Sequence, residues 1–190
     1  KIDMKSKLRL RKKCLEKREI FFKIKGNDCL KKIDVTTIIL EIKSKLKISS
    51  IGIYYPIKSE ISPLKIIEIC KNLSIEICLP IINKNTNELI FSKFDDKKCL
   101  TKNKYGIIEP TKINQITPDV IFAPMVGFDK NLNRLGYGKG YYDKVISKLR
   151  KIKKIFVIGL AYDNQMVRSI PIYNHDEKMD IILTDKKIYR

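Results

Sequence analysis

Short apolar runs that alternate with charged, helix-like segments are the feature that most constrains the fold of this chain. The runs are ISSIGIYYP (48–56), SIEICLPII (74–82), ELIFSKF (88–94), DVIFAPMV (119–126), KKIFVIGLAY (153–162) and MDIILTD (179–185). Continuous apolar runs of this length are typical of strands that are buried on both faces of a sheet. Their alternation with helical segments predicts an α/β fold with a mainly parallel, open sheet that is flanked by helices on both faces.

Four segments between these runs have the composition of helices. They are residues 4–25, a segment that is capped by Asn27 or Asp28 and runs to about Leu46, a segment that opens at Ser62-Pro63 and ends near Asn72, and residues 141–150. Proline is tolerated in the first turn of a helix. We expect run 88–94 at an edge of the sheet and residues 95–118 as a long connecting stretch. No composition shift marks a boundary, so residues 1–190 are expected to form one domain.

The cysteines and the hydropathy pattern bear on the compartment in which the chain works. Its 5 cysteines are scattered without a C-x-x-C pair, which indicates structural thiols in a reducing compartment rather than a zinc site. No apolar run approaches the roughly 20 residues that a membrane-spanning helix needs. The basic N-terminus lacks the apolar core of a signal peptide. We therefore expect a cytoplasmic protein that does not interact with membranes.

The net charge of +19 at pH 7 raises the question of a nucleic-acid partner. The positive side chains are mostly lysine and are spread along the whole chain instead of being gathered with aromatic residues. Three explanations stay open: compositional bias of the genome, attraction of small polyanionic substrates, and binding of nucleic acid. We expect no nucleic-acid partner, but a basic nucleic-acid-binding protein is the alternative to the function derived below.

A glycine-rich loop follows run 119–126 and precedes a helix, in the stretch NRLGYGKGYYD (133–143). Alternating glycines at Gly136, Gly138 and Gly140 allow the backbone to approach a ligand closely. Successive N–H groups and the N-terminus of the following helix favour an anion, and Arg134 and Lys139 add positive charge. The loop therefore suits phosphate, although it matches neither the Walker pattern nor the G-x-G-x-x-G fingerprint. The alternative is a tight strand-to-helix turn with incidental charge.

Two aspartates near this loop are candidate ligands for a divalent cation. Asp143 follows the loop directly, where a carboxylate can hold Mg²⁺ beside bound phosphates. Asp180 lies at the start of the last apolar run. Each also has a structural explanation, which is helix capping for Asp143 and a turn at the strand end for Asp180.

The stretch FAPMVGFDKNLNRLGYGKGYYDK (122–144) resembles the signature of the 5-formyltetrahydrofolate cyclo-ligase family, also called methenyltetrahydrofolate synthetases. The likeness extends along most of the chain. KSKLR resembles the K-x-x-L-R of the family, YYPIKSEI its substrate strand, LAYDNQ its segment after the next strand, and IPIYNHDEKMDIILTD its C-terminal segment. The long signature is highly specific, whereas K-x-x-L-R alone would match any basic helix.

The resemblance implies a ring closure that depends on ATP and Mg²⁺. It converts 5-formyltetrahydrofolate to 5,10-methenyltetrahydrofolate and releases ADP and phosphate. In this family the formyl oxygen attacks the γ-phosphate, N10 closes on the activated carbon, and phosphate leaves. No covalent enzyme intermediate forms, so the protein positions the reactants and stabilises charge. This agrees with the lack of an evident nucleophile, and the single His175 is expected in a turn or at the surface.

The resemblance also assigns roles to particular positions. Lys139 and Arg134 would act in catalysis, and Asp143 and Asp180 would hold Mg²⁺. The residues implied for ATP are Lys5, Arg9, Arg134, Leu135, Gly136, Tyr137, Gly138, Lys139, Gly140, Tyr141 and Tyr142. Those implied for the folate are Tyr55, Glu60, Tyr137, Gly138, Lys139, Gly140 and Tyr141. The expected partners are ATP and a folate that is possibly polyglutamylated, and the expected state is a monomer. Residues 95–118 and Tyr137 depart from the family pattern.

Overall fold

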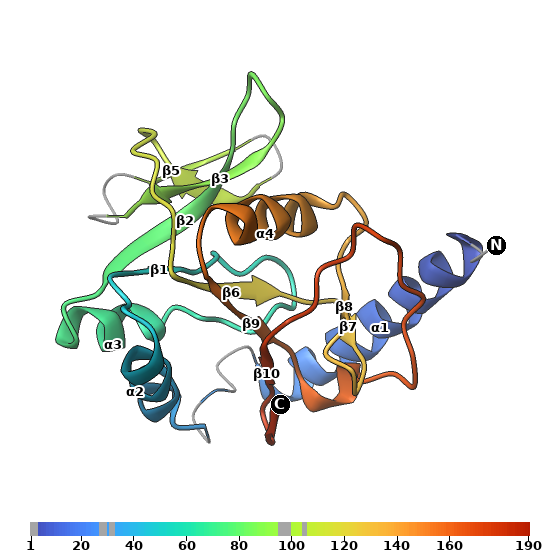
Figure 1. The fold of residues 1–190 in the computed structure, drawn as a ribbon. Coiled ribbons are helices and arrows are strands. Elements are labelled where there is room, and N and C mark those ends of the chain that lie inside the picture. The colour runs from blue at the N-terminus through green and yellow to red at the C-terminus, as the bar shows by residue number, and fades with distance from the viewer. Residues whose placement is uncertain (1–3, 27–29, 31–32, 95–99, 104–105) are drawn as a thin grey trace.

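A computed structural model describes residues 4–26, 30, 33–94, 100–103 and 106–190, and its centre is a seven-stranded sheet (Figure 1). The strands, in sheet order, are β11 (Ile188–Tyr189), β10 (Ile181–Leu183), β9 (Phe156–Leu160), β6 (Val120–Pro124), β1 (Ser50–Gly52), β2 (Glu76–Ile82) and β3 (Leu89–Lys93). The helices are α1 (Met4–Lys25), α2 (Val35–Lys45), α3 (Ile66–Asn72) and α4 (Tyr141–Ile152), with a short 3₁₀ turn η3 (Asp163–Gln165).

The five inner strands of the sheet are parallel, and the two outer ones are antiparallel to their neighbours. β3 pairs with β2 alone in this sheet, and β11 pairs with β10. The predicted α/β class with a mainly parallel open sheet is therefore confirmed, and so is the edge position of run 88–94.

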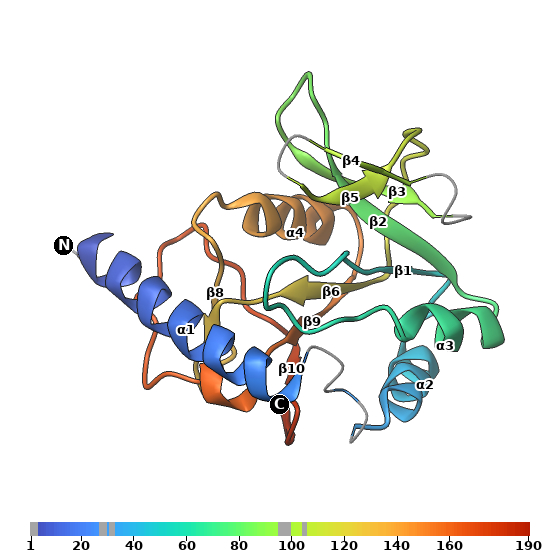
Figure 2. The same ribbon diagram turned by 180° about the vertical axis from the view of Figure 1, so that it is seen from behind.

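Two hydrophobic cores cover the opposite faces of the sheet, and α2 and α3 lie on one face while α4 lies on the other (Figures 1 and 2). Alternate side chains of a strand point to opposite faces. In β6, Val120 and Phe122 join the core under α2 and α3, whereas Ile121 and Ala123 join the core under α4. This two-sided burial explains why the strands read as continuous apolar runs.

The strand order reverses between β1 and β6. From β1 the chain passes through α3 to β2 on one side, and from β6 it passes through α4 to β9 on the other. In open α/β sheets, ligands bind at the carboxyl ends of the strands where the order reverses. The segments that leave β1 and β6, at Ile53 and Met125, are thereby placed at the expected position of a site.

The helix boundaries differ from the sequence prediction at two starts. α1 has the predicted bounds. α2 starts at Val35 because the carboxylate of Asp34 caps it, accepting hydrogen bonds from the backbone N–H of Thr37 (3.0 Å) and from its hydroxyl (2.7 Å). The predicted caps Asn27 and Asp28 lie outside the described residues. α3 starts at Ile66, because Pro63 belongs to the turn before it.

The stretch 95–118 contains a hairpin where only a connection was expected. Within its described part, β4 (Leu100–Lys102) pairs antiparallel with β5 (Ile108–Pro110), and Gly106 takes the left-handed backbone conformation at the turn (φ 77°). The strands are short, and β4 is largely exposed, so they carry no apolar run. A second hairpin, β7 (Gly127–Phe128) with β8 (Arg134–Leu135), was also not predicted. No described helix is long and apolar enough to cross a membrane.

Candidate functional site

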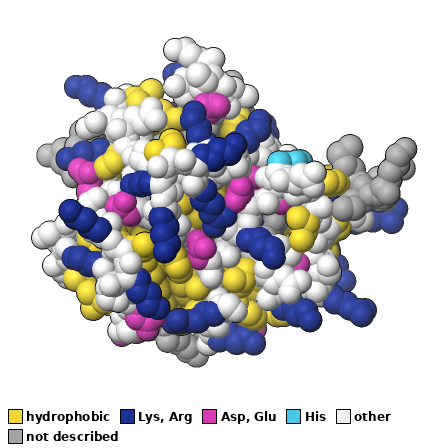
Figure 3. Space-filling view, viewed as in Figure 1, with side chains coloured by type: hydrophobic (Ala, Val, Ile, Leu, Met, Phe, Trp, Pro, Cys, Tyr) yellow, Lys and Arg dark blue, Asp and Glu magenta, His cyan; other side chains and the backbone are white. Residues whose placement is uncertain are grey.

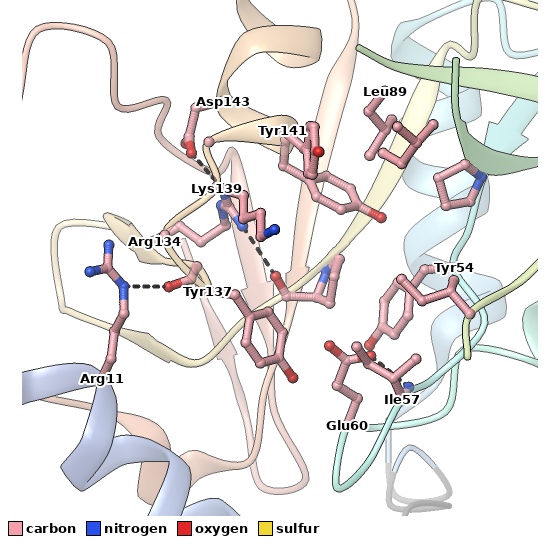
Figure 4. Close-up of a pocket in the computed structure, with 18 of the residues that line it drawn as sticks. Arg11, Tyr54, Ile57, Glu60, Leu89, Arg134, Tyr137, Lys139, Tyr141 and Asp143 are labelled. Atoms are coloured by element: carbon pink, nitrogen blue, oxygen red, sulfur yellow. Dashed lines mark hydrogen bonds and ion pairs between the residues drawn. The ribbon is translucent and has the colours of Figure 1, made fainter. Parts of the chain in front are cut away.

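A cavity of about 980 Å³ opens at the carboxyl ends of β1, β2 and β6, where the strand order reverses (Figure 4). Its size lies at the upper end of the range for ligand pockets. It is lined by the start of α1, the turn after β1, the ends of β2 and β6, the start of β3, the β4–β5 hairpin, the glycine-rich loop with the first turn of α4, and residues 173–176. Such a volume can hold more than one small molecule.

The glycine-rich loop is held by a buried polar scaffold. Asp129 is 1% exposed, and its carboxylate accepts hydrogen bonds from the backbone N–H groups of Asn131, Asn133 and Ile170 and from the side chain of Asn133. These bonds fix the β7–β8 connection from which the loop departs. Gln165 supports the end of β6 by donating to the carbonyls of Met125 and Val126 (both 2.8 Å). The side chains of Asp129 and Gln165 thus fix the backbone on which the glycine-rich loop rests.

The loop backbone turns twice through conformations that favour glycine. Gly138 has φ 100° and Gly140 has φ 68°. Gly140 is also the N-cap of α4, and no side chain caps that end of the helix. The N-terminus of α4 therefore points its N–H groups toward the loop, and the helix dipole adds partial positive charge there. This arrangement is suited to an anion.

Arg134 lies beneath the loop and is committed to a buried ion pair. Its Nη2 lies 2.7 Å from Oδ2 of Asp143, and the two side chains are 5% and 13% exposed. Its Nε is buried without a hydrogen-bond partner in the part of the chain that is described. A Cβ added at Gly136 would lie 2.8 Å from Nη1 of Arg134, so a larger residue there would displace the guanidinium over which the loop passes.

One face of α1 borders the phosphate-suited end of the cavity, and it carries Lys7, Leu8 and Arg11. Nε of Arg11 donates to the carbonyl of Gly136 (2.8 Å) and so ties the helix to the loop. Nζ of Lys7 pairs with Oδ2 of Asp176 (2.5 Å) and lies 4.3 Å from the ring centroid of Tyr173. The cations of α1 thus hold the loop and residues 173–176 in place.

Glu60 lies at the opposite end of the cavity, in the turn after β1 (Figure 4). It is 3% exposed, and its Oε2 accepts from the backbone N–H of Ile57 (2.9 Å). Burial raises the pKa of the Glu60 carboxyl, and the Ile57 hydrogen bond and the charge of Arg18 oppose that rise. A buried carboxylate with spare acceptor sites is suited to a ligand that presents N–H donors.

Three tyrosines surround Glu60: Tyr54, Tyr137 and Tyr142. Burial and, next, the charge of Glu60 raise the pKa of each of them, to about 12 for Tyr137. Their phenols therefore stay protonated at neutral pH, and that of Tyr54 donates to the carbonyl of Ile61 (2.7 Å). Figure 4 shows the hydroxyl of Tyr137 directed toward the carboxylate of Glu60.

The wall between the two ends is apolar, with a polar rim. It is made by the end of β2 (Pro80, Ile81 and Ile82) and by Leu89 of β3. The β4–β5 hairpin adds Asn103, Ile107 and Glu109, and the Asn103 amide donates to Glu109 Oε2 (2.8 Å). A flat, apolar ring system fits against such a wall.

Most of the predicted site residues are brought together in this one cavity. Those that line it are Tyr55, Glu60, Arg134, Gly136, Tyr137, Gly138, Lys139, Gly140, Tyr141, Tyr142 and Asp143. Two others, Arg9 and Leu135, lie elsewhere. Arg9 is exposed because it is two residues, and so about 200° of helix rotation, from Lys7 and Arg11 on α1. Leu135 is fully buried in the small core formed with Cys14, Val126 and Ile170. The side chain of Lys5 lies outside the described residues.

Asp180 is the third predicted residue that the structure places away from the cavity. It precedes β10, at the amino end of the parallel strands, and its Oδ2 accepts from the backbone N–H of Val157 (2.7 Å) and pairs with Arg150 (3.2 Å). Arg150 is seven residues after Asp143 on α4, which is about 10 Å along the helix. The expectation that Asp143 and Asp180 share one cation is therefore not met by this arrangement.

The residues present fit Mg²⁺ only as an ion that arrives with phosphate. No group of three or more His, Cys, Asp or Glu side chains among the described residues could hold a metal ion. Asp143 alone among the two predicted ligands reaches the cavity, where its Oδ1 also accepts from the backbone N–H of Glu177 (3.3 Å). Mg²⁺ is commonly held by one or two carboxylates together with substrate phosphates. Asp143 beside a phosphate loop meets that requirement.

Several residues of the cavity were missed from the sequence, among them Lys7, Leu8 and Arg11 on α1, whose buried face continues through Cys14 and Arg18. Lys7, Arg11, Cys14 and Arg18 share one helix face, at spacings of four, three and four residues. Three of the four are cations, so the buried face of α1 looked solvated. His175, expected in a turn or at the surface, is exposed, stacks on Tyr173 and borders the cavity.

The positive charge is distributed broadly over the surface. On the face shown in Figure 3, Lys and Arg side chains are scattered among acidic and apolar ones rather than gathered in one stripe. The buried cysteines Cys14, Cys70 and Cys78 are free thiols, and burial raises the pKa of Cys70 to about 12. Thiols in this state are not nucleophiles at neutral pH.

Comparison with known proteins gives one consistent family. Residues 3–185 match the 5-formyltetrahydrofolate cyclo-ligase family. A Mycoplasma pneumoniae 5-formyltetrahydrofolate cyclo-ligase is 31% identical over 178 residues, which cover 93% of this chain and 97% of that protein. The enzyme of that name from Haemophilus influenzae is 30% identical over 155 residues, covering 78% and 82%. The solved structure of Aquifex aeolicus 5,10-methenyltetrahydrofolate synthetase superposes with a TM-score of 0.73 and 28% identity, covering 97% and 92%.

Proposed function

This chain belongs to the 5-formyltetrahydrofolate cyclo-ligase family, and we propose that it catalyses the ATP-dependent closure of 5-formyltetrahydrofolate to 5,10-methenyltetrahydrofolate. The formyl oxygen displaces ADP from the γ-phosphate, N10 then attacks the formyl carbon, and phosphate leaves as the ring closes. The observation that carries the proposal is the single cavity with a phosphate-suited loop at one end and a buried carboxylate at the other.

At the phosphate end, the loop and the N-terminus of α4 bind the triphosphate of ATP. The N–H groups of the loop donate to phosphate oxygens, and Lys139 supplies a full positive charge beside the transferring group. Arg134 positions the loop through its ion pair with Asp143, and its unpartnered Nε is a buried donor left for a phosphate oxygen. Arg11 keeps the loop in place through Gly136.

At the folate end, Glu60 accepts hydrogen bonds from the amino and ring N–H groups of the pterin edge. Its fixed position follows from the Ile57 hydrogen bond and from its burial. Tyr55 and the apolar wall of Pro80, Ile81 and Leu89 pack on the ring system and exclude water from it. The two reacting groups then meet near Tyr137, between the ends of the cavity.

We include Mg²⁺ in this proposal as an ion held by phosphate oxygens and Asp143. When bound there it neutralises phosphate charge during transfer. Asp143 would exchange part of its contact with Arg134 for the ion. Asp180 has a structural role at the amino end of the sheet instead.

We propose that residues 1–190 act as one domain, as a monomer in the cytoplasm. The surplus lysines support, by charge complementarity alone, a preference for polyglutamylated folate.

A turnover assay tests the proposed function. Product formation is followed by the absorbance of 5,10-methenyltetrahydrofolate, with ATP, Mg²⁺ and 5-formyltetrahydrofolate all present and with each omitted in turn. We expect turnover only in the complete mixture, with ADP and phosphate released in equal amounts. Folate-independent ATP hydrolysis, or no product in the complete mixture, would refute it.

The alternative function, nucleic-acid binding, rests on the net charge and is tested separately. Generic oligonucleotides are titrated at two salt concentrations, since counterion release makes such binding fall steeply with salt. Steeply salt-dependent binding without turnover would favour this alternative. Turnover with weak, unsaturable oligonucleotide binding favours the enzyme.

A further inference from the structure

Arg18 is a fully buried cation on the most highly charged helix of the chain. It is 1% exposed, while its neighbours Lys17 and Glu19 are exposed on α1. Burial of an isolated charge is strongly unfavourable unless hydrogen bonds and a countercharge compensate for it. Arg18 does not line the cavity, so the burial of its charge must be explained by its contacts within the protein.

The guanidinium of Arg18 joins the two ends of the cavity. Its Nη2 donates to the hydroxyl of Tyr137 in the glycine-rich loop (2.6 Å), and its Nε donates to Ser59 Oγ in the turn that carries Glu60 (3.1 Å). Its Nη1 donates to the carbonyl of Met125, just after β6 (3.2 Å). One side chain thus contacts the segments that leave β1 and β6 and the loop between them.

The buried carboxylate of Glu60 belongs to the residue after Ser59 and lies within electrostatic reach of Arg18. The charge of Arg18 opposes the rise in the pKa of Glu60 that burial causes. Tyr137 accepts a hydrogen bond from Arg18, and Figure 4 shows its hydroxyl directed toward the carboxylate of Glu60. The direction of the bond from Arg18 is fixed, since a guanidinium has no acceptor, so the hydroxyl keeps its own hydrogen for a neighbouring acceptor such as Glu60.

We propose that Arg18 is a positioning residue for folate recognition, which acts through its hydrogen bonds to Tyr137 and Ser59 to hold the Glu60 carboxylate in place, near its own positive charge, at the folate end of the cavity. Arg18 itself does not touch the substrate. The role in folate binding rests on the proposed function, whereas the coupling of Arg18 to Glu60 does not.

The other groups around Glu60 cannot replace Arg18. The groups that face Glu60 are Arg18 on α1, Lys58 in its own turn, Tyr54 after β1, Tyr137 in the loop and Tyr142 on α4. The tyrosines are neutral at neutral pH, and Lys58 is exposed. Without Arg18, Glu60 would therefore take up a proton at a higher pH and lose its capacity to accept two hydrogen bonds.

The first experiment measures the binding of 5-formyltetrahydrofolate by calorimetry from pH 5 to 8 without ATP. It compares Arg18→Met, Arg18→Lys and the matched control Lys17→Met, which removes one exposed charge from the same helix. We expect Arg18→Met to weaken binding roughly tenfold or more at neutral pH. Its loss of affinity with falling pH should begin at a higher pH than in wild type, and Glu60→Gln should lack that loss. Lys17→Met should stay within about twofold of wild type.

The second experiment needs no ligand. The titration of the Glu60 carboxyl is followed by NMR in protein with ¹³C-labelled glutamate, and the signal is assigned with Glu60→Gln. We expect its midpoint to rise by about one pH unit or more in Arg18→Met, and to rise less in Tyr137→Phe, which keeps Arg18 and loses only the hydroxyl.

The outcomes separate the inference from the proposed function. An unchanged Glu60 midpoint in both variants, or equal folate affinities for Arg18→Met and Lys17→Met, would overturn the inference even if the protein is active. Failure of wild type to bind the folate would refute the proposed function, while the NMR titration would still decide whether Arg18 controls Glu60. If Arg18→Met does not fold, the Glu60 midpoint and the folate affinity of Arg18→Lys and Tyr137→Phe are compared with those of wild type instead.

Discussion

The two ends of the parallel strands both carry acidic residues, but they use them differently. At the amino end, Asp119 and Asp180 hold backbone N–H groups and pair with Lys153 and Arg150. At the carboxyl end, Glu60 and Asp143 border the cavity. An aspartate or glutamate at the end of a strand is therefore not sufficient by itself to indicate a ligand-binding site.

Asp119 and Glu60 differ in what each carboxylate leaves unoccupied. Oδ2 of Asp119 accepts bonds from Ser49 and Ser50, and Oδ1 pairs with Lys153 at 2.6 Å, so both oxygens are used. The Glu60 carboxylate lies open to the cavity beside its Ile57 and Tyr137 contacts. We expect substitutions at the carboxyl end to change kinetics and those at the amino end to change stability.

Lys139→Ala should have the largest effect. It removes a charge that lines the cavity and that, under the proposed function, faces the transferring phosphoryl group, where negative charge must be stabilised during transfer. We expect kcat to fall on the order of 10²–10³-fold with a smaller change in the affinity for the folate. Steady-state kinetics with Lys144→Ala, an exposed lysine on α4, as the control measures this. A kcat within about threefold of wild type would remove Lys139 from catalysis.

Glu60→Gln should have the next largest effect. The amide keeps the size but turns one acceptor into a donor, so donors of the pterin are left unpaired. The cost of about 1–3 kcal/mol corresponds to roughly a 10- to 100-fold rise in KM for 5-formyltetrahydrofolate. KM for ATP should change little, and Glu68→Gln on the exposed face of α3 serves as the control. Equal effects on both substrates would contradict the assignment.

Asp143→Asn and Asp180→Asn test which end of the sheet serves Mg²⁺. An amide is a weaker ligand for a hard cation, so Asp143→Asn should raise the Mg²⁺ concentration for half-maximal activity several-fold. Asp180→Asn should leave it unchanged and lower the melting temperature, since it weakens the contacts with Val157 and Arg150. The reverse pattern would return Asp180 to the metal site.

Asp119→Asn should have the smallest effect and act on stability alone. Burial opposes the ionised form, but the bonds from Lys153, Ser49 and Ser50 outweigh it and lower the pKa of Asp119 to about 2. A lowered pKa in the folded state stabilises it above the unfolded value near 4, and this stabilisation is lost as the pH falls toward 2.

We expect Asp119→Asn to reduce the free energy of unfolding by roughly 1 kcal/mol at neutral pH, because solvent partly screens the carboxylate. The difference from wild type should shrink between about pH 5 and pH 2, as measured by urea unfolding. A constant difference over that range would show that the carboxylate charge is not the cause, and a change in kcat would contradict the division between the two ends.

The parts of the molecule that could be predicted are those encoded locally. The apolar runs predicted the parallel sheet, and the contiguous stretch 133–143 predicted the loop and its cations. α1 shows the limit, since its buried face carries Lys7, Arg11 and Arg18, whose burial depends on partners more than 40 residues away in sequence. The β4–β5 hairpin was missed because its strands have no apolar alternation.

The boundary errors have equally local causes. Leu30 and Ile33 pack into the core although they precede α2. Because they continue the apolar pattern of that helix, the sequence prediction started the helix too early, before the Asp34 cap. Asp180 was assigned to the site from its place in a resembling segment. Asp180 directly precedes β10, and a residue before a parallel strand lies at the amino end of the sheet, away from the cavity.

The most direct test of the account is whether both substrates occupy the one cavity at the same time. Calorimetry measures the binding of a non-hydrolysable ATP analogue with Mg²⁺ to the protein alone and to the protein saturated with 5-formyltetrahydrofolate. Because the phosphate and folate ends are separate parts of the cavity, we expect one analogue to bind per chain in both titrations, with an affinity that the folate does not reduce. Displacement of one ligand by the other would show that they compete for the same end, and would contradict the account.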